Sequence, residues 1–146
     1  MKKKEAVKKG TASNKESSSK KESSPKPIVL VVEDEISIAK AQELILSDRY
    51  QVHIAHDGET GLTKAKQLKP HVVVLDIMMP KMSGYDVCRQ IRNDSGLSST
   101  RIVMVTAKNQ DKDEALAMDL GADDYIMKPF EPEELLHVIN QVLKNV

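Results

Sequence analysis

The stretch VVVLDIMMP at residues 72–80 decides the fold, because an apolar run there ends in a single carboxylate. Three Val and one Leu precede Asp76, and Ile77 and two Met follow it. A short, continuous run of mostly β-branched residues favours a strand that is buried on both faces. Aspartate is a poor strand residue and is rarely buried without a partner. Asp76 therefore either forms a turn or supplies a negative charge at a strand tip.

Strand-like and helix-like segments alternate from Ile28 onward. The strand-like segments are 28–32, 50–55, 71–76, 101–106 and 124–127, and the helix-like segments are 36–48, 57–68, 83–93, 109–120 and 131–143. In the first helix-like segment, Ile38, Ala41 and Ile45 recur at helical spacing. Five such units predict an α/β fold: a (βα)5, doubly wound, flavodoxin-like sheet of five parallel strands in the order 2-1-3-4-5.

The N-terminal 27 residues differ in composition from the rest of the chain. They hold nine Lys and three Glu, a charge of +6, whereas residues 28–146 hold 13 Lys or Arg and 19 Asp or Glu, a charge of −6. A Lys/Ser-rich segment with so few apolar residues cannot bury enough surface to fold. We therefore predict a disordered tail at 1–27 and one domain at 28–146, whose acidic charge argues against nucleic-acid binding.

Several functional classes are disfavoured by what the sequence lacks. No apolar run approaches the roughly 20 residues of a membrane-spanning helix, so we expect no transmembrane segment. The single cysteine, Cys88, allows no internal disulfide and suits a cytoplasmic protein; we expect it to pack in the core. No GxGxxG or GxxxxGK[ST] motif is present, which argues against dinucleotide and P-loop nucleotide sites.

Polar residues gather at the predicted carboxyl ends of the strands. Glu33 and Asp34 follow the first strand, Asp76 ends the third, Thr106 ends the fourth, and Lys128 ends the fifth. Ligands of doubly wound sheets bind at this edge, where the first and third strands are neighbours. Carboxylate oxygens suit a hard cation, so we expect Mg²⁺, with Mn²⁺ as the alternative ion. A cation, an ammonium and a hydroxyl around one carboxylate would hold a phosphoryl group, with Asp76 as nucleophile.

Four separated motifs, VVEDE, VVVLDIMMP, MVTA and GADDYIMKPF, resemble those of the receiver domain of two-component response regulators. The resemblance extends over residues 28–146. It implies that Asp76 is the phosphoacceptor and that Glu33, in place of the commoner aspartate, forms the acidic pair with Asp34. It also implies the remaining roles: a metal ligand in the backbone carbonyl of Met78, a switch pair in Thr106 and Tyr125, phosphoryl binding by Lys128, and a cis Lys128–Pro129 peptide bond.

The resemblance further implies a signalling switch. A histidine kinase, or a histidine phosphotransfer protein, would donate the phosphoryl group, and the surface of the fourth helix, fifth strand and fifth helix would then control a downstream protein. The chain ends soon after the fifth helix, so we expect a protein contact or a phosphorelay step, without direct DNA binding by the receiver. The resemblance is compatible both with a monomer and with a dimer that forms on phosphorylation. We expect no enzymatic activity beyond self-phosphorylation and slow self-dephosphorylation.

Three other functions are compatible with part of this sequence. A phosphatase of the haloacid dehalogenase type also uses an aspartyl phosphate, but it carries a second Asp two residues later, where this chain has Met78. A binder of nucleic acid or membrane surfaces could work through the basic tail. A pseudo-receiver would signal without phosphate, although all the residues that phosphorylation requires are present.

Overall fold

The computed structural model describes residues 25–107 and 111–144. Its centre is one parallel sheet with the strand order β2-β1-β3-β4-β5, which confirms the predicted order. The strands are β1 (Ile28–Val32), β2 (Gln51–Ala55), β3 (Val72–Asp76), β4 (Arg101–Ala107) and β5 (Asp124–Lys128). Because β1 pairs with both β2 and β3, the first and third strand tips lie side by side.

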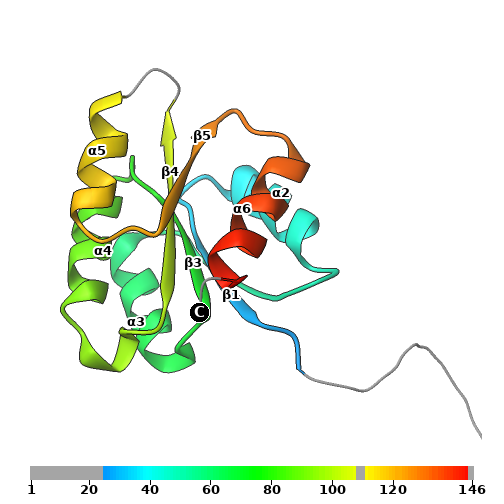
Figure 1. Cartoon of the computed structure of the whole chain (residues 1–146), viewed down its shortest axis with the longest axis horizontal. Coiled ribbons are helices and arrows are strands. Elements are labelled where there is room, and N and C mark those ends of the chain that lie inside the picture. Colours follow the sequence, from blue (N-terminus) through cyan, green and yellow to red (C-terminus); the bar gives the residue numbers. More distant parts are fainter. Residues whose placement is uncertain (1–24, 108–110, 145–146) are drawn as a thin grey trace, which may run out of the picture.

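Helices cover both faces of the sheet (Figure 1). One face carries α2 (Ile36–Leu46) and α6 (Pro132–Lys144), and the other carries α3 (Gly58–Leu68), α4 (Gly84–Arg92) and α5 (Asp111–Asp119). A short 3-10 helix, Ser95–Leu97, follows α4. This short helix was not predicted from the sequence, because three residues are too few to show a helical period.

The central strand β3 is buried along its whole length. Its residues alternate between the two cores: Val73 and Leu75 pack with α3 and α4, while Val72 and Val74 pack with α2 and α6. Burying one such side chain stabilises the fold by roughly 1.5–3 kcal/mol. The apolar run before Asp76 thus holds the two helical layers together and fixes the position of the strand tip.

The residues that showed the helical spacing of α2 are not the ones that this helix buries most deeply. The buried residues of this helix are Ala39, Gln42 and Leu46, whereas Ile38 and Ile45 are half-buried and Ala41 is exposed. The helix is apolar on more than one side, so its periodicity did not single out the face that meets the sheet. The group Ile38, Ala41 and Ile45 lines a surface cleft instead.

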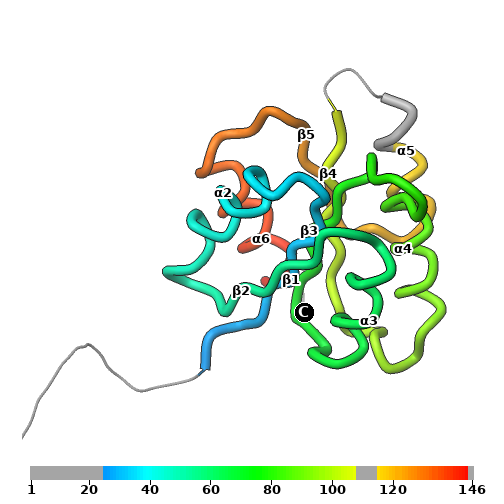
Figure 2. Tube along the Cα trace, turned by 180° about the vertical axis from the view of Figure 1, so that it is seen from behind, coloured from blue at the N-terminus to red at the C-terminus, as the bar shows by residue number. Residues whose placement is uncertain are grey.

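The described chain enters the sheet far from the strand tips. Residues 25–27 lead into β1 at its amino end, and both ends of the described chain lie at that edge of the sheet (Figure 2). The predicted tail lies outside the described residues as far as position 24. None of the helices in residues 25–107 and 111–144 combines the length and apolar character that a membrane crossing requires.

Candidate functional site

Strand geometry brings three predicted site residues to one face of the sheet. Alternate residues of a strand point to the same side. Val29 and Val31, Val72 and Val74, and Ile126 all pack in the core below α2 and α6. Two residues beyond Val31, Val74 and Ile126, the chain has Glu33, Asp76 and Lys128, respectively, whose side chains therefore point to the same side. All three therefore lie at the carboxyl edge of the sheet on the α2 and α6 side.

The three side chains meet. The Lys128 ammonium lies 3.1 Å from Glu33 Oε1 and 3.4 Å from Asp76 Oδ2. Both carboxylates are almost fully buried, with 1% of Glu33 and 5% of Asp76 exposed. Buried carboxylates need a compensating positive charge, and Lys128 supplies it across 95 and 52 residues of sequence, respectively.

Asp34 completes an oxygen-rich group. One carboxylate oxygen from each of Glu33, Asp34 and Asp76 lies within 4.8 Å of the others. Asp34 has no hydrogen-bond or ion-pair partner among the described residues. Three carboxylates that face a single ammonium leave a net negative charge, which a divalent cation with oxygen preference would balance. The residues present therefore fit a Mg²⁺ ion.

Burial and charge shift two pKa values in this site. Burial raises the pKa of Glu33 to about 7, and the charge of Asp76 adds to the rise, while a hydrogen bond from Glu35 N–H and the nearby Lys128 oppose it. Burial also disfavours the charge on Lys128, but Asp76 and Glu33 outweigh that effect and raise its pKa. The ammonium is thus kept charged beside the carboxylates.

The loop after β3 positions the candidate acceptor through its backbone. The N–H of Met78 donates to Asp76 Oδ1 at 3.2 Å, and the Met78 side chain is 68% exposed. At Gly84, where α4 begins, an added Cβ would meet the Asp76 carbonyl oxygen and lie 2.7 Å from Ile77 Cα. The absence of a side chain at Gly84 lets the helix approach the strand end this closely.

The predicted switch residues lie on the neighbouring strands. Thr106 is buried at the end of β4, one residue beyond Val105, the register partner of Asp76. Tyr125 is half-buried on β5 and packs against the core on the α3 and α4 side. The Lys128–Pro129 peptide bond is cis, as expected from the resemblance. Lys108, beside the site in sequence, lies outside the described residues.

Two residues that shape the site, His56 and Gly84, were not predicted from the sequence. His56 Nδ1 lies 3.0 Å from the backbone carbonyl oxygen of Glu33 and so holds the acidic loop to the end of β2. Gly84 permits the close approach described above. A single histidine after a strand and a glycine at the start of a helix occur in many contexts, so neither residue carries a sequence signal for its contact.

The family of the chain follows from comparison with known domains. Residues 29–140 match the model of the response regulator receiver domain. This match covers most of the chain, and it includes every residue of the site described above. The chain therefore belongs to the family of response regulator receiver domains.

Individual relatives agree with this family. The response regulator ArlR of Staphylococcus haemolyticus is 43% identical over 117 residues, which are 80% of this chain and 52% of ArlR. The DNA-binding response regulator MtrA of Mycobacterium tuberculosis is 45% identical over 109 residues, which are 74% of this chain and 46% of MtrA. The chain thus spans about half the length of the curated relatives it matches.

A solved structure has the same architecture over its whole length. The chemotaxis response regulator CheY4 of Vibrio cholerae aligns with a TM-score of 0.76 and 33% identity, covering 80% of this chain and 98% of CheY4. The sheet order and the helical layers are therefore those of a receiver domain, as the motifs implied.

Proposed function

We propose that this receiver domain is a phosphorylation switch in which Asp76 accepts a phosphoryl group from a phosphohistidine. The observation that supports this most directly is the pairing of Lys128 with both Asp76 and Glu33 at the sheet edge. The donor would be a sensor histidine kinase or a histidine phosphotransfer protein. A cation at Glu33, Asp34, Asp76 and the Met78 carbonyl would neutralise the incoming phosphoryl charge.

The residues of the chain have separate tasks in the transfer. The Met78 N–H and the Lys128 ammonium each bind one oxygen of the Asp76 carboxylate, which orients it for attack. An Asp76 oxygen bonds to phosphorus as the phosphorus–nitrogen bond breaks, and the electron pair of that bond stays on the histidine nitrogen. Lys128 then pairs with the transferred phosphoryl oxygens, and the Thr106 hydroxyl donates to them.

The proposed output surface is formed by α5, β5 and α6. It exposes three large apolar side chains: Leu116 and Met118 on α5 and Met127 on β5. We infer that phosphorylation moves Thr106 and Tyr125 and so shifts this surface between two states that bind a downstream protein differently.

A phosphatase function receives no support from the loop after Asp76. Phosphatases of the haloacid dehalogenase type, which also form an aspartyl phosphate, carry a general acid two residues beyond the nucleophile. That position is Met78, whose thioether cannot transfer a proton. We therefore propose a long-lived aspartyl phosphate and no turnover on external phosphate esters.

The test is to treat the full chain with acetyl phosphate and Mg²⁺ and to measure the intact mass. We expect one added phosphoryl group on the wild-type chain and none on Asp76→Asn. Asp48→Asn, which changes an exposed aspartate remote from the sheet edge, should be phosphorylated normally. An unchanged wild-type mass, or phosphorylation of Asp76→Asn, would contradict the proposal.

A further inference from the structure

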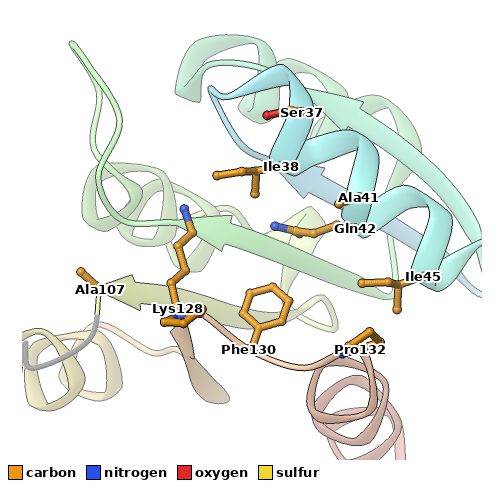
Figure 3. Close-up of a pocket in the computed structure, with 10 residues that line it drawn as sticks. Ser37, Ile38, Ala41, Gln42, Ile45, Ala107, Lys128, Phe130 and Pro132 are labelled. Atoms are coloured by element: carbon orange, nitrogen blue, oxygen red, sulfur yellow. The ribbon is translucent and has the colours of Figure 1, made fainter.

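The turn between β1 and α2, residues 33–35, carries two of the three carboxylates that would hold a cation. The Glu33 side chain in this turn is held at both oxygens. Its Oε1 lies 3.1 Å from the Lys128 ammonium, and its Oε2 accepts from the Glu35 N–H at 3.1 Å. The Lys128 side chain extends toward the first turn of α2, which carries Ile38, and so reaches this turn (Figure 3).

The Asp34 carboxylate has no comparable support. Within residues 25–107 and 111–144 it has no hydrogen-bond or ion-pair partner, so its position depends on the backbone that carries it. That backbone is fastened to the end of β2 on both sides of Glu33. The Glu33 N–H donates to the Ala55 carbonyl at 2.9 Å, and the Glu33 carbonyl lies 3.0 Å from His56 Nδ1. A carbonyl oxygen only accepts, so Nδ1 carries the proton in this contact.

The bond from His56 fixes the direction in which the chain carries Asp34. The Glu33 carbonyl belongs to the planar peptide unit that links Glu33 to Asp34, so a bond to its oxygen restrains the whole plane. His56 is itself well placed, because only residues 56 and 57 lie between β2 and α3, and Asp57 caps α3. The two ends of the bond therefore lie on fixed parts of the fold.

We propose that His56 is a positioning residue for the cation: through the Glu33 carbonyl it orients the Asp34 carboxylate and so raises the affinity of the site for a divalent cation. This inference rests on the proposed function, in which a cation binds among Glu33, Asp34 and Asp76. Groups that hydrogen-bond around a metal ligand raise metal affinity by fixing the ligand. His56 contacts the turn and not the reacting atoms, so its effect falls on cation binding rather than on phosphoryl transfer.

The test compares His56→Asn with His56→Leu, two side chains of nearly equal shape that differ in the donor. The Asn amide nitrogen is as many bonds from Cα as Nδ1 is, so it can donate to the same carbonyl. Binding of Mn²⁺ to the unphosphorylated full chain is measured by electron paramagnetic resonance, and binding of Mg²⁺ by competition. We expect His56→Leu to bind both ions about tenfold more weakly than wild type, and His56→Asn to bind them almost as tightly as wild type.

A second measurement separates this role from a general loss of structure. In phosphorylation by acetyl phosphate, His56→Leu should need more Mg²⁺ for the half-maximal rate and reach the wild-type rate at saturating Mg²⁺. Because the His56 side chain is exposed, both His56 variants should unfold in urea at similar concentrations. His56→Ala, which also lacks the donor, should behave like His56→Leu.

His53→Leu is the matched control. It removes another histidine of β2, whose ring bonds to the Gln51 side chain and not to the acidic turn, and it should bind Mn²⁺ like wild type. The inference is wrong if His56→Leu binds Mn²⁺ as tightly as wild type, or if His56→Asn binds as weakly as His56→Leu. A wild-type chain that binds neither ion would overturn the proposed function as well. Cation binding that weakens in His56→Leu, in a chain that acetyl phosphate does not modify, would overturn the phosphorylation alone.

Discussion

The carboxylate of Glu33 is held by opposing forces. Its burial favours the protonated form, whereas Lys128 and the N–H of Glu35 favour the ionised form. The outcome is a pKa of about 7, so the protonated and ionised forms of Glu33 are both populated close to neutral pH. A cation that binds here must replace that proton or find the group already ionised.

We predict that Glu33 makes the metal-free protein less stable as pH rises. Its pKa is raised in the folded state, from 4.5 to about 7, so the folded state binds more protons than the unfolded state in this range. The free energy of unfolding should therefore decrease from pH 4.5 to pH 7, by up to about 1 kcal/mol per pH unit. Urea titrations in a chelating buffer at several pH values measure it.

Glu33→Gln isolates this contribution, because glutamine does not titrate. The difference in the free energy of unfolding between wild type and Glu33→Gln should change across this pH range and be constant well above it. In excess Mg²⁺ the decrease in the free energy of unfolding with rising pH should be offset, because the cation binds the ionised Glu33 carboxylate. A difference between the two proteins that does not depend on pH would refute the assignment.

The composition of the site could be predicted from the sequence because it depends on sheet order. Once β1 and β3 are neighbours, Glu33, Asp34 and Asp76 must converge, and the tip of β5 contributes Lys128. Contacts that depend on individual backbone atoms could not be predicted. The bond between His56 and the Glu33 carbonyl is an example, because no residue pattern records the direction of a carbonyl group.

The start of α4 packs closely against the end of β3 at the site. Ser83 and Asp86 form a capping box that satisfies backbone N–H groups at the helix start. Gly84 then lies against the backbone of Asp76 and Ile77. The helix therefore supports the loop that orients the Asp76 carboxylate.

We predict that Gly84→Ala destabilises the protein by about 1–3 kcal/mol, the usual effect of overpacking. The new methyl group would have to push α4 away from the strand end, so phosphorylation by acetyl phosphate should also slow. Thermal unfolding and the intact-mass assay measure the two effects.

Gly96→Ala is the matched control for this prediction. A Cβ at Gly96 would approach only the side-chain ends of Asp94 and Lys69, at 3.2 Å, and these can move aside. Its stability should stay within about 0.5 kcal/mol of wild type. Equal effects of the two substitutions would mean that the close approach at Gly84 is unimportant.

Helix and strand positions were predicted to within a few residues, because apolar periodicity and caps mark them. Asp57 caps α3 as an extended residue that accepts from Thr60 N–H, and Gly121 takes a positive φ of 102° after α5. The orientation of α2 could not be predicted from this spacing, since Ile38 and Ile45 are apolar but only half-buried. A polar residue, Gln42, occupies the core side, and its burial depends on tertiary packing that periodicity does not record.

At the scale of the whole molecule, Arg92 ties three segments together far from the site. Its guanidinium donates to the Gly121 carbonyl at 2.7 Å, to the Thr100 carbonyl at 2.9 Å and to Asp123 at 2.8 Å. These contacts join the end of α4 to the start of β4 and to the loop before β5. The tie lies at the amino edge of the sheet, away from Asp76.

We predict that Arg92→Ala lowers the free energy of unfolding by about 1–2 kcal/mol and leaves phosphorylation intact. The two carbonyl oxygens and the Asp123 carboxylate would lose the charged donor to which they are bonded. The groups around Asp76 would keep their contacts. Denaturant unfolding and the intact-mass assay test the two parts separately.

Arg89→Ala provides the comparison, because Arg89 pairs with Asp86 on the exposed side of α4. An exposed ion pair contributes little, so the change in stability should be below about 0.5 kcal/mol. If Arg92→Ala is folded but is no longer phosphorylated, the contacts of Arg92 do influence the site, and the prediction is wrong.

The order of the strands has a consequence for quality control in the cell. Lys128 is 95 residues from Glu33 and 52 from Asp76 along the chain, and the three meet only when β1, β3, β4 and β5 have assembled. A nascent or misfolded copy scatters these groups, and under the proposed function it has no means of taking a phosphoryl group. Only correctly folded molecules would then be phosphorylated. Misfolded copies would neither consume the phosphoryl donor nor act on the downstream protein.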